Sequence, residues 1–224
     1  MPVSPVVASV HDPLARLRTR TAALAPDDGV AVCAGVLLAA VDDPEGAADD
    51  PPARALAREL ADRLLAAWDA EARGGPLAAC WRPVFRLRRH PRLTPLQFAL
   101  AGLNAQFGYD VPLALIGSTA RLSGGEPGTV EREFHRAAQP LLLALDEAAH
   151  DWLAPYWSAL RVADPLTHLV GVWNADRARQ QALTSCRIYA QLAERPTGAA
   201  EFTEQLAARA GTTAALLLTP LTPP

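Results

Sequence analysis

Apolar residues recur along this chain at the three- and four-residue spacing of an α-helix, whereas the alternating apolar and polar runs typical of β-strands are scarce. Signals that start helices are frequent. Asp50-Pro51, Thr94-Pro95 and Asp164-Pro165 each place a capping side chain before a proline, which suits the first position of a helix. The pattern therefore predicts an all-α fold.

The spacing also predicts where the helices lie. They are expected over residues 13–25, 30–41, 51–73, 95–107, 112–122, 130–150, 152–161, 165–193 and 199–218. Pro140 is a candidate position for a kink and Gly211 for an interruption. Thr94 and Gln97 have the spacing of a capping box at the start of helix 95–107.

The helix over residues 95–107 is apolar on most sides, and such a helix must be surrounded by other elements. The 224 residues, half of them hydrophobic, fit a single domain with an ample core. The sequence thus predicts one all-helical domain over residues 1–224, a multi-helix bundle around this central helix.

Polar side chains interrupt the apolar pattern just after the middle of this helix. Asn104, Gln106 and Asp110 lie on or beside its apolar stripe, and burying an amide or a carboxylate is unfavourable unless it is hydrogen-bonded. These groups either satisfy one another in the core or line a cavity. Two simpler roles stay open: Asn104 bonding the backbone of a crossing helix, and Asp110 capping a helix that begins at Pro112.

A second interruption lies in the late helix over residues 165–193. There Asp176, Arg177 and Gln180 stand where the apolar stripe would continue. Either these residues pair with Asp110 and Asn104 as a buried salt bridge whose hydrogen bonds are satisfied, or they surround a ligand. Both arrangements would bring the late helix against the polar end of the central one.

One block of the chain, residues 81–116, combines Trp81-Arg82-Pro83, the run LQFALAG, Asn104-Ala105 and Asp110. In this combination the chain resembles a mostly bacterial family of unknown function, numbered 5995. The resemblance implies a shared fold and no particular activity.

The likeness extends to a later segment and also has departures. Arg179 matches an arginine in the family's later helix, which makes it the expected partner of a carboxylate such as Asp110. Gln106 stands where the family usually has histidine, Gly108 where it has asparagine, and Tyr109 where it has arginine. A neutral amide therefore replaces a group that titrates near neutral pH.

The amino-acid composition excludes several kinds of function. All basic residues are arginine, so neither a lysine Schiff base nor a P-loop is available. A net charge of −3 offers no field for nucleic acid. The one basic run, between Arg82 and Arg92, either seats an anionic ligand or is a solvated connector.

Known site motifs are missing from the sequence. Three cysteines without CxxC spacing indicate neither disulfides nor a zinc site, which fits a cytoplasmic protein. The histidines form no metal-binding pattern, and no glycine-rich nucleotide motif occurs, so no metal and no cofactor are expected. No apolar run reaches the roughly 20 residues of a membrane span.

Polar residues within apolar helical stripes, together with many tryptophans, suggest a cofactor-independent enzyme acting on a small, largely apolar molecule in an inter-helical cavity. Cyclisation, isomerisation or elimination would suit such a cavity, and specialised metabolism is one setting for such a reaction. A non-catalytic binding protein and a structural helical domain are the alternatives, and a homo-oligomer is left open. The expected catalytic residues are Asp110, Asn104 and Gln106, and the expected substrate-binding residues are Tyr109, Trp173, Asp176, Arg177 and Arg179.

Overall fold

The computed structural model describes residues 12–43, 50–119, 128–160, 174–192 and 195–220, and every regular element among these residues is a helix. The predicted all-α class is confirmed. The elements are α2 (Pro13–Ala22), α3 (Gly29–Asp42), α4 (Pro51–Ala72), α5 (Arg82–Leu87), α6 (Pro95–Ala105), η2 (Gln106–Asp110), α7 (Val111–Thr119), α8 (Thr129–Glu133), η3 (Phe134–Ala138), α9 (Gln139–Leu160), α11 (Ala175–Leu192) and α12 (Pro196–Leu217).

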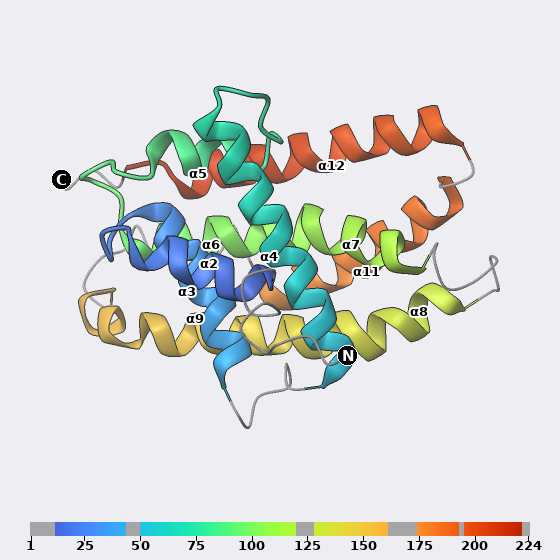
Figure 1. Ribbon diagram of the computed structural model, residues 1–224, viewed down its shortest axis with the longest axis horizontal. Coiled ribbons are helices and arrows are strands. Elements are labelled where there is room, and N and C mark those ends of the chain that lie inside the picture. The colour runs from blue at the N-terminus through green and yellow to red at the C-terminus, as the bar shows by residue number, and fades with distance from the viewer. Residues whose placement is uncertain (1–11, 44–49, 120–127, 161–173, 193–194, 221–224) are drawn as a thin grey trace, which may run out of the picture.

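The central helix is formed by α6, η2 and α7, which follow one another without a break. In Figure 1 it runs through the middle of the molecule, between α12 and the α8–α9 helix, and α4 crosses it. Every residue of α6 from Leu96 to Ala105 is buried. The prediction of an apolar helix surrounded by the others is therefore confirmed.

The predicted capping box holds the start of α6. Gln97 N–H donates to the Thr94 hydroxyl and the Thr94 N–H donates to Gln97 Oε1, at 3.4 and 3.0 Å. The other end of the same amide reaches α12, since Gln97 Nε2 donates to the carbonyls of Leu217 and Thr219 at 2.9 and 2.8 Å. One buried side chain thus ties the first turn of α6 to the last turn of α12.

Neither Pro112, where one helix was expected to give way to the next, nor Pro140, the candidate kink, interrupts its helix, because the helix widens for one turn before each of them. The Val111 N–H donates to the Gln106 carbonyl and the Gln139 N–H to the Phe134 carbonyl, each five residues back. Pro112 and Pro140 follow directly. A proline ring crowds the carbonyl four residues earlier and offers no N–H, and a π turn absorbs both effects.

The continuous helix corrects two predictions. Residues 95–107 and 112–122 were expected to form separate helices, and a cap of the second was one role left open for Asp110. Asp110 instead lies within the π turn and the helix passes through it. The expected interruption at Gly211 is also wrong, since α12 continues to Leu217. The helix start expected at Asp164-Pro165 lies outside the described residues.

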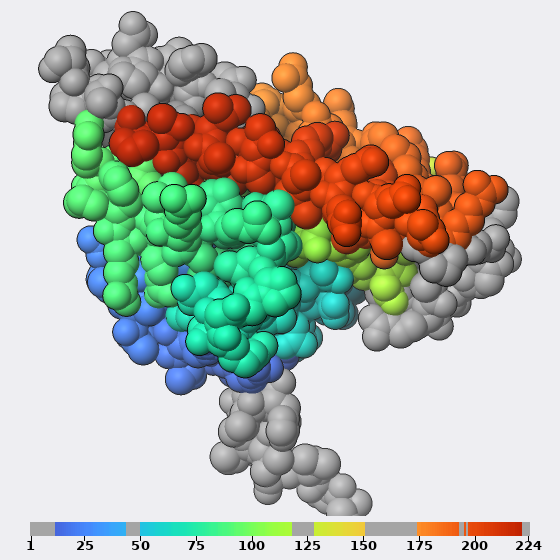
Figure 2. All heavy atoms as spheres, turned by 90° about the horizontal axis from the view of Figure 1, so that it is seen from above, coloured from blue at the N-terminus to red at the C-terminus, as the bar shows by residue number. Residues whose placement is uncertain are grey.

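Gly211 serves close packing instead. A Cβ built there would lie 2.6 Å from the carbonyl oxygen of Ala79, so only glycine lets the backbone ahead of α5 approach α12 this closely. Figure 2 looks onto this side of the molecule, where α12 runs along the surface with α11 beside it.

We expect Gly211→Ala to lower the free energy of unfolding by about 1–3 kcal/mol, because a backbone carbonyl must move away from the added methyl group. Gly108→Ala is the matched control, since its Cβ would meet Ala210 Cβ at 3.5 Å, an ordinary contact, and alanine favours a helix. Urea unfolding of both variants measures the difference. Equal stabilities would show that Gly211 is not required by packing.

Candidate functional site

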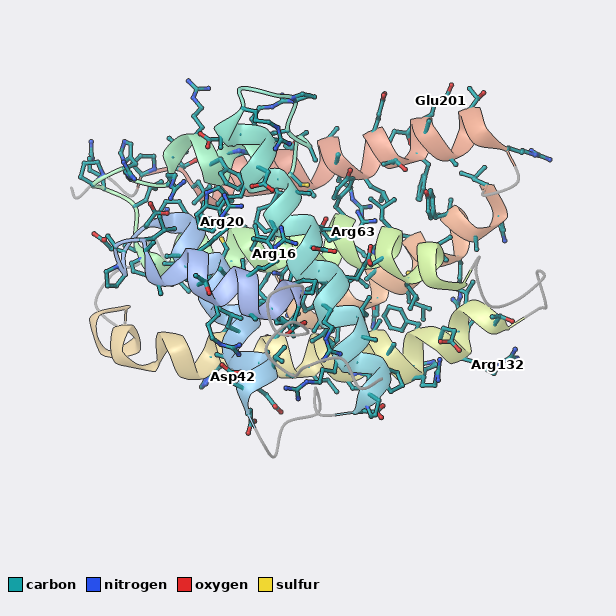
Figure 3. All side chains as sticks on the ribbon, viewed as in Figure 1. Arg16, Arg20, Asp42, Arg63, Arg132 and Glu201 are labelled. Atoms are coloured by element: carbon teal, nitrogen blue, oxygen red, sulfur yellow. The ribbon has the colours of Figure 1, made fainter. Side chains whose placement is uncertain are left out.

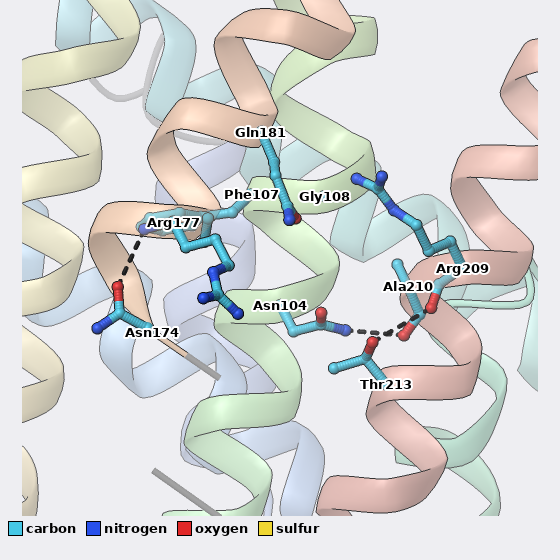
Figure 4. Close-up of a pocket in the computed structure, with 10 residues that line it drawn as sticks. Asn104, Phe107, Gly108, Asn174, Arg177, Gln181, Arg209, Ala210 and Thr213 are labelled. Atoms are coloured by element: carbon cyan, nitrogen blue, oxygen red, sulfur yellow. Dashed lines mark hydrogen bonds between the residues drawn. The ribbon is translucent and has the colours of Figure 1, made fainter. Parts of the chain in front are cut away.

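A pocket of about 200 Å³ opens where η2, α11 and α12 meet. Small residues at the helix crossing, Gly108, Ala178 and Ala210, leave this space. The polar part of the wall consists of Asn104, Asn174, Arg177, Gln181, Arg209 and Thr213. In Figure 4 these side chains come from three helices, and the central helix is drawn between α11 and α12.

Asn104 forms the floor of the pocket and is itself nearly buried, with 8% exposed. Its Nδ2 donates to the Ala210 carbonyl at 2.8 Å, which fixes the amide against α12 (Figure 4). The role of bonding a crossing helix is confirmed, and the same residue also lines a cavity. Its expected catalytic role stays a prediction.

Arg177 of α11 and Arg209 of α12 both line the pocket, and in Figure 4 the Arg177 guanidinium lies beside Asn104 while that of Arg209 lies near Gly108. Within the described parts of the chain, neither guanidinium group forms an ion pair or a hydrogen bond. Arg177 lies in the first turn of α11, whose N-terminus is capped by the Asn174 side chain, Oδ1 accepting from the Arg177 N–H at 3.0 Å. The pocket therefore combines two positive charges with the positive end of a helix dipole.

Among the described residues of the late helix, neither Arg177 nor Arg179 pairs with Asp110, so the ion-pair alternative is wrong for these two arginines. Arg179 instead bonds Asp146 of α9 at 3.3 Å and also pairs with Asp176 one turn earlier. Gln180 is exposed. Of the predicted polar band, only Arg177 faces the pocket.

Asp110 lies in a separate buried cluster. Its Oδ2 accepts a hydrogen bond from Trp81 Nε1 at 2.9 Å, and both side chains are buried. Burial raises the pKa of the Asp110 carboxyl to about 7, against the opposing effects of the Arg63 charge and the Trp81 N–H. Arg63 comes from α4, the helix that crosses the central one (Figure 3).

Two further predicted residues belong to the core around Asp110 rather than to the pocket. Tyr109 is half-buried, and burial raises its pKa, as do the neighbouring Cys80 and Asp110. Gln106 is 2% exposed, and its Oε1 has no hydrogen-bond partner among the described residues. Neither residue is part of the pocket wall.

The structure therefore divides the predicted site. It brings Asn104 and Arg177 together at the pocket and leaves Asp110, Gln106 and Tyr109 outside its wall. Asp176 and Arg179 pair with each other at the surface of α11. Trp173 lies outside the described residues. The sequence reasoning missed four polar wall residues, which no motif marks: Asn174, Gln181, Arg209 and Thr213.

The basic run after Trp81 is partly structural. Arg88 Nε donates to both carboxylate oxygens of Asp28, at 3.0 and 2.8 Å, and Asp28 in turn caps α3 through the Val30 N–H. Arg88 and Arg20 also lie over the Trp68 ring. Arg88 therefore anchors the basic run to the core.

The three cysteines are buried and unpaired. Burial raises the pKa of Cys33 and Cys186 to about 12 and that of Cys80 as well, so the thiols stay protonated at neutral pH. Among the described residues, no three histidine, cysteine or acidic side chains gather in an arrangement that could hold a metal ion. None of the described helices is long and apolar enough to cross a membrane.

The sequence model of a family of unknown function (DUF5995) matches residues 10–220, and the chain belongs to this family. No curated protein and no solved structure matches the chain. The resemblance seen in the sequence is thus confirmed over nearly the whole length of the chain.

We expect Asp110→Asn to change how stability depends on pH. The pKa of Asp110 is about 7 in the folded chain and near 3.9 in an unfolded one, so the folded state binds this proton more tightly. The stabilisation of the folded state by this proton is fully present below about pH 4 and is lost as the pH rises to about 7. Above pH 7 the ionised carboxylate should therefore lower the wild-type free energy of unfolding by up to about 4 kcal/mol.

Asparagine keeps an oxygen that can accept from Trp81 Nε1 but has no charge to bury. Relative to wild type, the variant should be increasingly stable as the pH rises from about 4 to 7, as measured by urea unfolding. Asp27→Asn, at an exposed carboxylate, is the control. A difference between Asp110→Asn and wild type that does not change with pH would show that Asp110 ionises as freely as a surface group.

Proposed function

We propose that this protein binds a small molecule in the pocket between η2, α11 and α12. The observation that supports this most is the convergence of polar side chains from separate helices on a space left by small residues. Ligand sites typically combine such a cavity with a few placed polar groups. The volume of about 200 Å³ suits a small compound or one end of a larger one.

The pocket wall favours binding over proton transfer. Its polar side chains are amides, a hydroxyl group and guanidinium groups, none of which exchanges a proton near neutral pH. These groups can orient a ligand by hydrogen bonds. They also favour a polar ligand over the largely apolar one that the sequence pattern suggests.

A cofactor-independent enzyme is the second candidate, and Asp110 is the residue that favours it. A buried carboxyl with a pKa of about 7 can act as a general acid or base at neutral pH, and such groups concentrate at active sites. Asp110 belongs to the same π turn as the wall residues Phe107 and Gly108. A compound bound by both wild type and Asp110→Asn but converted only by wild type would establish this activity.

The compartment proposed for this activity is the cytoplasm. All three cysteines are unpaired, as is usual where thiols are kept reduced.

Ala178→Trp should block the pocket. Ala178 is a half-buried wall residue of α11, and an indole ring there would occupy much of the space. In a thermal-shift screen with anionic, neutral and cationic metabolite-sized compounds, any compound that stabilises the wild type should lose its effect on this variant. Ala208→Trp, at an exposed position of α12 outside the wall, should keep the effect. Ligands that stabilise both variants equally would place the binding site elsewhere.

A further inference from the structure

We infer that the ligand of this pocket carries an oxyanion, a carboxylate or a phosphate group, held between Arg177 and Arg209. The inference rests on the proposed function and specifies the chemistry of the ligand. Its starting point is that two arginines from different helices line the same pocket, Arg177 extending toward Asn104 and Arg209 toward Gly108 (Figure 4).

The charge of this pair is uncompensated. Many arginines of the described chain have a carboxylate partner, among them Arg16, Arg88, Arg136 and Arg187. Arg177 and Arg209 have none there, and no acidic side chain belongs to the pocket wall. Two like charges directed at one cavity repel each other unless an anion lies between them.

The acidic residue next to Arg177 in the sequence already has a partner. Asp176 precedes Arg177 in the first turn of α11, but its carboxylate pairs with Arg179 and its side chain is 78% exposed. It does not line the pocket. The positive charge of the cavity therefore remains available to a ligand.

The other wall groups suit an oxyanion as well. Asn104 and Gln181 carry amide N–H groups, and the first turn of α11 directs the positive end of its dipole to the same region. Guanidinium groups bind carboxylate and phosphate through parallel N–H donors, and such charge-assisted bonds are among the strongest in proteins. An oxyanion would thus meet donors from both sides of the pocket.

The competing basic surface is the open depression formed by Glu71 and residues 86–91. Its wall contains an acidic residue, and Arg88 is held by Asp28. Arg86 of this surface is exposed and makes no ion pair with a described residue, so it provides a matched control for an unpaired arginine outside the pocket.

Titration calorimetry of the full chain with inorganic phosphate and with succinate tests the inference. We expect saturable binding of at least one anion, lowered about tenfold or more by Arg177→Ala and by Arg209→Ala, since each removes a charged hydrogen-bond partner. Arg86→Ala should bind like wild type. Both pocket arginines are exposed, so the variants should keep their fold, which circular dichroism checks.

The outcomes separate the ligand sources. Binding of phosphate alone indicates a phosphate group, binding of succinate alone indicates a carboxylate, and binding of both indicates a general oxyanion site. Binding of neither anion overturns the inference, as does binding that is lost in Arg86→Ala and kept in the two pocket variants.

Failure of the inference can be distinguished from failure of the proposed function. A neutral or cationic compound that binds wild type, Arg177→Ala and Arg209→Ala alike but is excluded by Ala178→Trp would overturn the oxyanion and leave the pocket as the ligand site. Anion binding that depends on Arg177 and Arg209 yet survives Ala178→Trp would place the anion outside the cavity and overturn both.

Discussion

The hydrogen bonds that two amides of α6 make to the backbone of α12 hold together the part of the molecule that contains the pocket. Gln97 reaches the Leu217 and Thr219 carbonyls, and seven residues later Asn104 reaches the Ala210 carbonyl. Because the contacts run in opposite directions along the two sequences, the helices are antiparallel and their register is fixed at two levels. The polar groups buried along α6 are thereby satisfied, and Asn104 is held at the pocket floor.

Pro112 imposes the second constraint, because the central helix must widen before it. The resulting π turn, Gln106–Asp110, presents residues on different sides of the helix. Phe107 and Gly108 contribute to the pocket wall, while Asp110 bonds Trp81 on the side where α4 supplies the charge of Arg63. A single turn therefore borders both a polar cavity and a buried carboxyl group, and π turns are often found at functional sites.

Sequence periodicity was sufficient for the helical class, for the central position of α6 and for the capping box at Thr94, because these depend on local patterns. It predicted a new helix at Pro112, where a π turn instead lets the helix continue. It also predicted an interruption at Gly211, where the glycine instead allows close packing against Ala79. It recognised that Asn104 and Arg177 interrupt apolar stripes. It could not find Arg209, since the meeting of α12 with the central helix is a long-range contact that leaves no periodic signal.

A crystal structure of the full chain soaked in selenate would test the electropositive pocket most directly. Selenate is a tetrahedral oxyanion whose selenium atom is located by anomalous scattering. We predict an anomalous peak within hydrogen-bonding distance of the guanidinium groups of both Arg177 and Arg209, beside the stretch of the central helix from Asn104 to Gly108. Well-ordered Arg177 and Arg209 side chains with no selenium between them, and a peak instead over the depression at Arg86, would contradict it.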